Sequence, residues 1–84
     1  MKERFIDKEM DLVIAKECVN DLIKGRLARI CLYMLDNNID DADDTQSVVQ
    51  CQKKLMVLLK EIGKASNVDS LNDIADEVKK IERF

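Results

Sequence analysis

Apolar side chains recur at helical spacing along most of the chain, and this pattern predicts three helices. We expect the first helix at about residues 2–35, the second at about 45–62 and the third at about 70–83. The chain contains no proline and only two glycines, so little in its composition opposes a helix. We therefore predict a single all-α domain, residues 1–84, that folds as a small antiparallel helical bundle.

The second expected helix has the most regular pattern. Its apolar positions alternate at spacings of three and four residues, as in the core of a coiled coil: Val48, Cys51, Leu55, Leu58 and Ile62. Further apolar residues widen this face, so the helix is expected to contact more than one neighbour.

The first expected helix is long and has two apolar stripes. At about 1.5 Å per residue, a helix over 2–35 would be roughly 50 Å long, about twice the second helix. The other two helices could not cover all of it, so we predict that homo-oligomerisation completes the bundle. The predicted oligomer interface consists of Leu12, Ala15, Val19, Leu22 and Ile23. In the alternative, the helix breaks near Gly25, since glycine costs about 1 kcal/mol relative to alanine, and the bundle has four helices.

Charge is balanced along the chain except in one segment. No lysine or arginine lies between Arg29 and Lys53. This interval contains all the surplus acidic side chains: Asp36, Asp40, Asp41, Asp43 and Asp44. The aspartates either cap the next helix within a solvated linker over residues 36–44 or also attract a basic partner, and we predict them as partner-binding residues. An EF-hand is excluded because Asp41 and Ser47 stand where it needs glycine and a bidentate glutamate.

The composition removes most familiar site chemistries. With no histidine, the chain lacks the commonest general base and the commonest metal ligand. Cys18, Cys31 and Cys51 show no C-x-x-C spacing, and we expect them to be reduced and to pack as small apolar residues. We predict that the protein is not an enzyme and has no cofactor or metal site.

Lys24, Arg26 and Arg29 form a short basic cluster, the candidate contact for an anion. The alternative function is therefore binding of a nucleic acid or a small anionic ligand by an oligomer through this cluster. Nucleic acid is the weaker partner, because the sequence pI is near 4.9 and no aromatic residue accompanies the cluster. A helix-turn-helix over residues 62–74 is also rejected, since Asp69 and Asp73 would oppose the phosphate backbone.

No apolar run approaches the roughly 18 residues that a membrane span needs, and the first residues do not resemble a secretory signal. We expect a cytoplasmic protein without membrane contact. A small helical chain without reactive groups is typical of a protein-binding module. We predict a regulatory, inhibitory or chaperone-like accessory protein that covers the surface of another protein.

Overall fold

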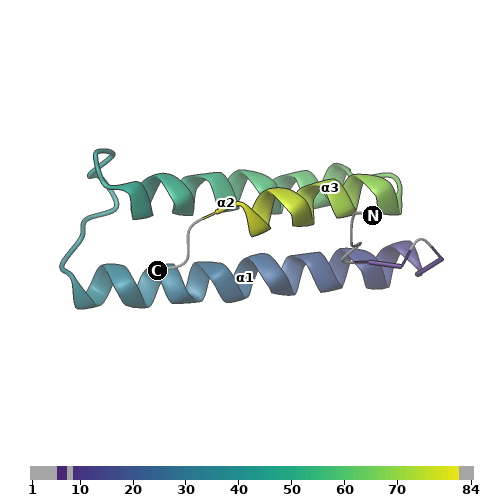
Figure 1. Ribbon diagram of the computed structural model, residues 1–84, viewed down its shortest axis with the longest axis horizontal. Helices are drawn as coiled ribbons and strands as arrows, with labels where there is room; N and C mark the ends of the chain where they lie inside the picture. Colours follow the sequence, from purple (N-terminus) through teal and green to yellow (C-terminus); the bar gives the residue numbers. More distant parts are fainter. Residues whose placement is uncertain (1–5, 8, 82–84) are drawn as a thin grey trace.

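Three α-helices pack together in the computed structural model, which describes residues 6, 7 and 9–81. Helix α1 spans Leu12–Asp36, α2 spans Ser47–Lys64 and α3 spans Val68–Lys79. No strand occurs among these described residues. Figure 1 shows α1 as one layer, with α2 and α3 packed against each other in the second layer. The predicted all-α fold with three packed helices is confirmed.

Helix α1 begins later than the sequence pattern predicts, and Asp11 is the reason. Its Oδ1 accepts hydrogen bonds from the backbone N–H groups of Val13, at 2.9 Å, and Ile14, at 3.4 Å. These bonds cap the first turn, and the described residues before Asp11 are not helical. Residues 2–5 and 8 of the predicted helix lie outside the described residues.

The same helix continues without a break across Gly25. Ile23 and Ile30, on either side of this glycine, are buried against the other helices. Burial of one such side chain is worth roughly 1.5–3 kcal/mol, which exceeds the cost of about 1 kcal/mol for a glycine within the helix. The described residues therefore contain no fourth helix made by a break at Gly25.

Helix α2 lies two residues beyond its predicted position, whereas α3 begins two residues earlier than predicted and ends at Lys79 instead of 83. Residues 82 and 83 of the predicted helix lie outside the described residues. Asn67 sets the start of α3, because its Oδ1 accepts a hydrogen bond of 2.8 Å from the backbone N–H of Ser70. Gly63 does not end α2, which continues to Lys64. Among the described residues, no helix is both long enough and apolar enough to span a membrane.

The core combines side chains from all three helices, and it covers most of the oligomer interface predicted from the sequence. Ala15, Val19 and Ile23 are 0% exposed, and Leu12 and Leu22 pack partly buried against the same cluster. These side chains face α2 and α3, which both pack on α1. One chain thus covers the stripe that we assigned to a second copy, so folded copies would have to associate through other side chains.

Asn72 is the buried polar side chain among the described residues, and it joins α3 to the segment before α1. Its Oδ1 accepts a hydrogen bond from the backbone N–H of Ile6, at 2.8 Å, and its Nδ2 donates one to the carbonyl of Ile6, at 3.0 Å. Buried amide groups are costly when left unpaired, and here both groups are paired. The pair holds the Ile6 side chain in the core, where it is 1% exposed.

Candidate functional site

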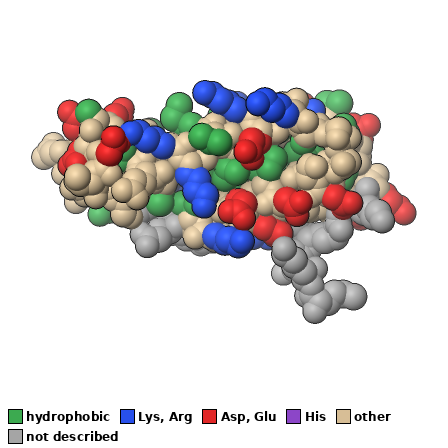
Figure 2. All heavy atoms as spheres, turned by 90° about the horizontal axis from the view of Figure 1, so that it is seen from above, with side chains coloured by type: hydrophobic (Ala, Val, Ile, Leu, Met, Phe, Trp, Pro, Cys, Tyr) green, Lys and Arg blue, Asp and Glu red, His purple; other side chains and the backbone are tan. Residues whose placement is uncertain are grey.

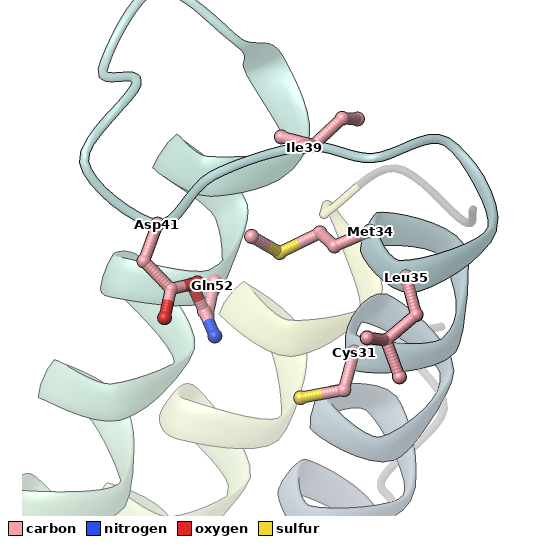
Figure 3. Close-up of a pocket in the computed structure, with 6 residues that line it drawn as sticks. All are labelled: Cys31, Met34, Leu35, Ile39, Asp41 and Gln52. Atoms are coloured by element: carbon pink, nitrogen blue, oxygen red, sulfur yellow. The ribbon is translucent and has the colours of Figure 1, made fainter.

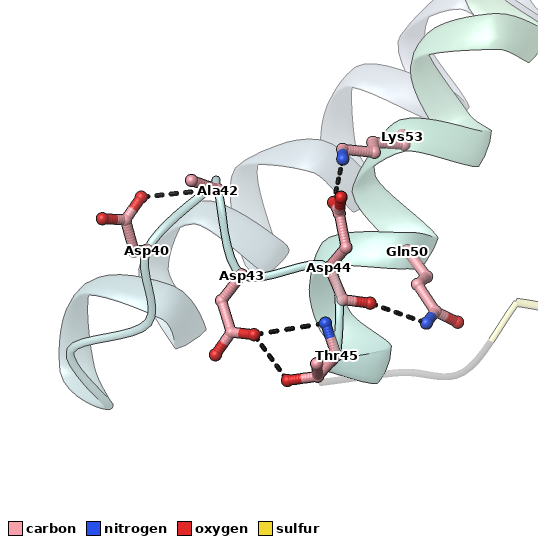
Figure 4. Close-up of polar contacts among 7 residues, drawn as sticks. All are labelled: Asp40, Ala42, Asp43, Asp44, Thr45, Gln50 and Lys53. Atoms are coloured by element: carbon pink, nitrogen blue, oxygen red, sulfur yellow. Dashed lines mark hydrogen bonds and ion pairs between the residues drawn. The ribbon is translucent and has the colours of Figure 1, made fainter.

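The acidic segment forms the end of α1 and the loop that leads to α2. Asp36 is the last residue of α1, and the other four aspartates lie in the loop over residues 37–46. Asp40 closes a tight turn, because its Oδ1 accepts a hydrogen bond of 2.9 Å from the backbone N–H of Ala42. Asp43 does the same for Thr45, accepting from its backbone N–H at 3.2 Å and from its hydroxyl (Figure 4).

Asp44 fixes the loop to α2. Its carboxylate pairs with Lys53, and its backbone carbonyl accepts a hydrogen bond of 2.9 Å from Nε2 of Gln50. Hydrogen bonds from the side chain and backbone of Thr45 hold the pKa of Asp43 below its ordinary value. Asp40, Asp43 and Asp44 therefore build the loop, and any contact of the segment with a partner remains a prediction.

The aspartates do not converge on a common centre. Figure 4 shows the carboxylates of Asp40, Asp43 and Asp44 pointing in different directions. Within the described part of the chain, no three carboxylate or thiol side chains are grouped so that they could hold a metal ion. A hard cation such as calcium needs six or more oxygen ligands around one point, which this arrangement does not provide.

An open hollow of about 340 Å³ lies beside this loop, between the end of α1 and α2. Its walls are mostly apolar, and they consist of Cys31, Met34, Leu35, Ile39, Asp41 and Gln52. Figure 3 shows the Cys31 thiol directed toward the same space as Asp41 and Gln52. The thiol has no basic group among these neighbours to activate it, so the hollow is suited to an apolar side chain of a ligand and not to covalent chemistry.

The basic cluster predicted from the sequence is divided by the geometry of α1. Two residues along a helix correspond to a rotation of about 200°, so Lys24 and Arg26 lie on nearly opposite sides. Arg26 is partly buried and donates from Nη1 to the carbonyl of Ile81 at 3.4 Å. Arg26 and Arg29 do line one shallow hollow, together with Asp21, but Lys24 is not part of it. The three cations therefore do not form one anion-binding face.

The outer face of α1, which points away from α2 and α3, exposes large apolar side chains. Ile14, Leu32 and Leu35 are 52%, 62% and 75% exposed. They belong to a series at alternating spacings of four and three residues, which we call the outer seam: Ile14, Cys18, Asp21, Gly25, Ala28, Leu32 and Leu35. Such spacing places all seven on one side of a helix, as in the seam of a coiled coil. In Figure 1 no other helix lies on this side of α1.

Sequence reasoning missed the outer seam although its spacing was visible. Asp21 and Gly25 interrupt the apolar series, while the inner stripe is apolar throughout. Ile14 and Cys18 belong to the second apolar stripe of the first expected helix, but that stripe covers only its N-terminal half. The heptad spacing over the full length of α1 is the signal that identifies the seam.

The surface over α2 and α3 has a different character, because charged side chains dominate it. Figure 2 shows basic side chains along the upper edge, and basic and acidic side chains interspersed with apolar ones over the rest of this surface. Lys54 of α2 and Glu77 of α3 form an exposed ion pair at 3.6 Å across the two helices. Exposed pairs of this kind contribute little to stability. Compared with this surface, the outer seam is the better candidate for a site of contact.

Comparison of the chain with protein-family models, with curated proteins and with solved structures finds no match. The interpretation of the outer seam therefore depends on its geometry and chemistry.

Proposed function

We propose that this protein is a small protein-binding module that covers the surface of another protein with the outer seam of α1. The supporting observation is the exposure of Ile14, Leu32 and Leu35 on a helix face that neither α2 nor α3 covers. Grouped exposed apolar side chains commonly mark interaction sites. An apolar helix face of this kind binds in a hydrophobic groove or against another helix. A regulatory, inhibitory or chaperone-like accessory protein would act by occupying such a surface.

The seam offers enough apolar surface to bind. Full burial of an isoleucine or leucine is worth roughly 1.5–3 kcal/mol, and these three side chains still expose half or more of their surface. Covering them would contribute on the order of 3–5 kcal/mol, before the cost of losing independent motion. Affinity would then depend on additional contacts at the rim, where charge can select the partner.

The acidic segment supplies such a rim at the C-terminal end of the seam. Asp36 follows Leu35 directly in the sequence, and Asp41 and Leu35 both line the hollow beside the loop. We therefore expect a partner surface with basic residues beside an apolar anchor. Replacing Asp36 and Asp41 by asparagine removes charge without touching the hydrogen bonds that build the loop. In stopped-flow measurements the double variant should associate more slowly at low ionic strength and at the parental rate in high salt.

Affinity capture with two matched variants tests the proposed function. Leu32→Glu changes the seam, whereas Val57→Glu introduces the same charge at a 55% exposed position on α2. Immobilised parental protein and Val57→Glu should retain the same proteins from a lysate of the source cells, and Leu32→Glu should lose them. Calorimetry with the purified partner should then show at least a tenfold loss of affinity for Leu32→Glu. Equal binding by both variants would contradict a role for the seam.

A further inference from the structure

The residues of the outer seam complement the same residues of a second copy whose α1 runs in the opposite direction. We propose that a second copy of this chain occupies the seam. The two α1 helices pack antiparallel, and the two-fold axis crosses the outer seam at the level of residue 23 along the helix. This inference rests on the proposed function and names the partner of the seam from Ile14 to Leu32, while the acidic rim beyond Leu35 lies outside the paired residues. The interface would be isologous, because each copy contributes the same side chains.

A single register pairs six of the seven seam residues with one another. With one helix reversed, Ile14 of one copy lies opposite Leu32 of the second copy, and Cys18 lies opposite Ala28. Asp21 lies opposite Gly25 in the same register, because all three pairs have the same midpoint along the helix. The large side chains therefore meet at the two ends of the interface, and the small ones meet near its centre. Leu35 has no seam counterpart in this register and lies opposite Asp11, at the start of the other α1, with the exposed Val13 nearby.

The charges near the centre favour the antiparallel orientation. Asp21 and Lys24 are both exposed, and within the described part of the chain neither forms an ion pair. In the antiparallel register Asp21 of each copy lies beside Lys24 of the other, which gives two reciprocal pairs. A parallel arrangement would place Asp21 against Asp21 and Lys24 against Lys24. Polar residues within an otherwise apolar seam commonly determine orientation in this way.

Gly25 is consistent with a close approach of two helices at this point. An added Cβ at this position would meet nothing within 4 Å in the single chain. The fold of one copy therefore gives no steric reason for a glycine at this exposed helical site, where alanine is favoured by about 1 kcal/mol. A second helix packed on the same face would supply that reason, because small residues let two backbones come close.

Sedimentation equilibrium of the full chain between about 1 and 500 μM tests the dimer. The parental protein and the control Val57→Glu should approach twice the monomer mass of 9.7 kDa. Leu32→Glu and Ile14→Glu should stay monomeric with helicity unchanged by circular dichroism, since both positions are exposed in the single chain. A parental mass near 9.7 kDa at every concentration would overturn the proposed dimer.

Charge exchange tests the orientation in the same measurement. Asp21→Lys and Lys24→Asp should each weaken the dimer by at least about threefold, because each places like charges side by side. The double variant should restore the parental dissociation constant, since it reverses both pairs. In a parallel dimer neither single variant would create a new repulsion, so two single variants of parental affinity would overturn the antiparallel register.

The native thiols give an independent readout of orientation. Cys31 is exposed and Cys18 is half-buried on α1. A short bismaleimide should join Cys18 of one copy to Cys31 of the other, and peptide mapping by mass spectrometry would identify the link. Links of Cys18 to Cys18 and of Cys31 to Cys31 would contradict the proposal.

The proposed dimer can be wrong while the proposed protein-binding function is right. A monomeric parental protein that still retains cellular proteins through Leu32 would remove the second copy as partner and leave the seam as a binding surface. A monomeric protein whose captured proteins do not depend on Leu32 would remove both.

Discussion

The inner and outer faces of α1 share helical spacing and apolar character, but only the inner face is covered within the chain. Val19 on the inner face is 0% exposed, whereas Leu32 on the outer face is more than half exposed. The inner face has an uninterrupted series of apolar side chains, and the outer face includes Asp21 and Gly25 at its centre. The two shorter helices therefore dock on the face of α1 that offers the more continuous apolar surface.

A charge introduced on each face of α1 should have the largest and most unequal effects on stability. Val19→Asp places an unpaired carboxylate in the core and should cost about 4 kcal/mol or more, enough to unfold a domain of this size. Leu32→Glu, on the outer face, should change the free energy of unfolding by less than about 0.5 kcal/mol when both are measured as monomers. Urea unfolding followed by circular dichroism measures the two values. Similar destabilisation by both substitutions would contradict the assignment of inner and outer faces.

The inner face also depends on the contact between Asn72 and Ile6. Asn72→Ala removes both hydrogen bonds to the backbone of Ile6 and should cost about 1–3 kcal/mol, because the backbone groups lose their partner while buried. Asp73→Ala, at the neighbouring exposed position, serves as the control and should be nearly neutral. Urea unfolding gives the free energies, and hydrogen exchange should become faster at the Ile6 N–H in Asn72→Ala alone. Unchanged protection of this N–H would show that the contact does not hold the segment.

Gly25→Ala, on the outer face, should have effects of opposite sign on the stability of the monomer and on that of the dimer. As a monomer the variant should be more stable by up to about 1 kcal/mol, since alanine favours a helix and the added methyl group meets open space. The dimer should dissociate more readily, since the same methyl group would lie between two helices. Thermal unfolding at low concentration and sedimentation at high concentration measure the two effects. An unchanged or tighter dimer would argue against close contact at Gly25.

The smallest expected effect lies in the acidic loop, outside both faces. The pKa of Asp43 is lower in the folded protein than its ordinary value of 3.8, because Thr45 donates hydrogen bonds to its carboxylate. A lowered folded-state pKa stabilises the protein above the unfolded value, and this contribution disappears as the pH falls through the folded pKa. Stability should therefore decline below about pH 4. Thr45→Ala should raise the pKa of Asp43 in a carboxyl NMR titration, and an unmoved pKa would contradict this cause.

The sequence predicted the helices and the inner stripe, and in the structure α2 and α3 cover the stripe that was predicted as an oligomer interface. A first helix extending from residue 2 would have exceeded what α2 and α3 can cover. The cap at Asp11 shortens α1 to 25 residues, much closer to the 18 residues of α2. The segment before Asp11 instead returns Ile6 to the core through Asn72, which is 66 residues away in sequence. Periodicity is a local signal and cannot reveal such a contact.

The candidate site was less predictable, for reasons of helix geometry. Lys24 and Arg26 are close in sequence, yet a rotation of about 200° separates them around α1. The run of aspartates indicated a loop between the first two helices. The hydrogen bonds and ion pair of the individual aspartates depend on where the folded loop places Thr45, Gln50 and Lys53. The outer seam could have been found from its heptad spacing, once all of α1 was known to be one helix.

The Asn72 contact also constrains the order of folding. Ile6 precedes α1, but the side chain that bonds to its backbone, Asn72, lies in α3. On the ribosome the segment before α1 therefore cannot take its final place until α3 has been made. Contacts that join distant parts of a chain slow folding and make it cooperative. The Ile6 contact would thus form only when the bundle closes as a whole.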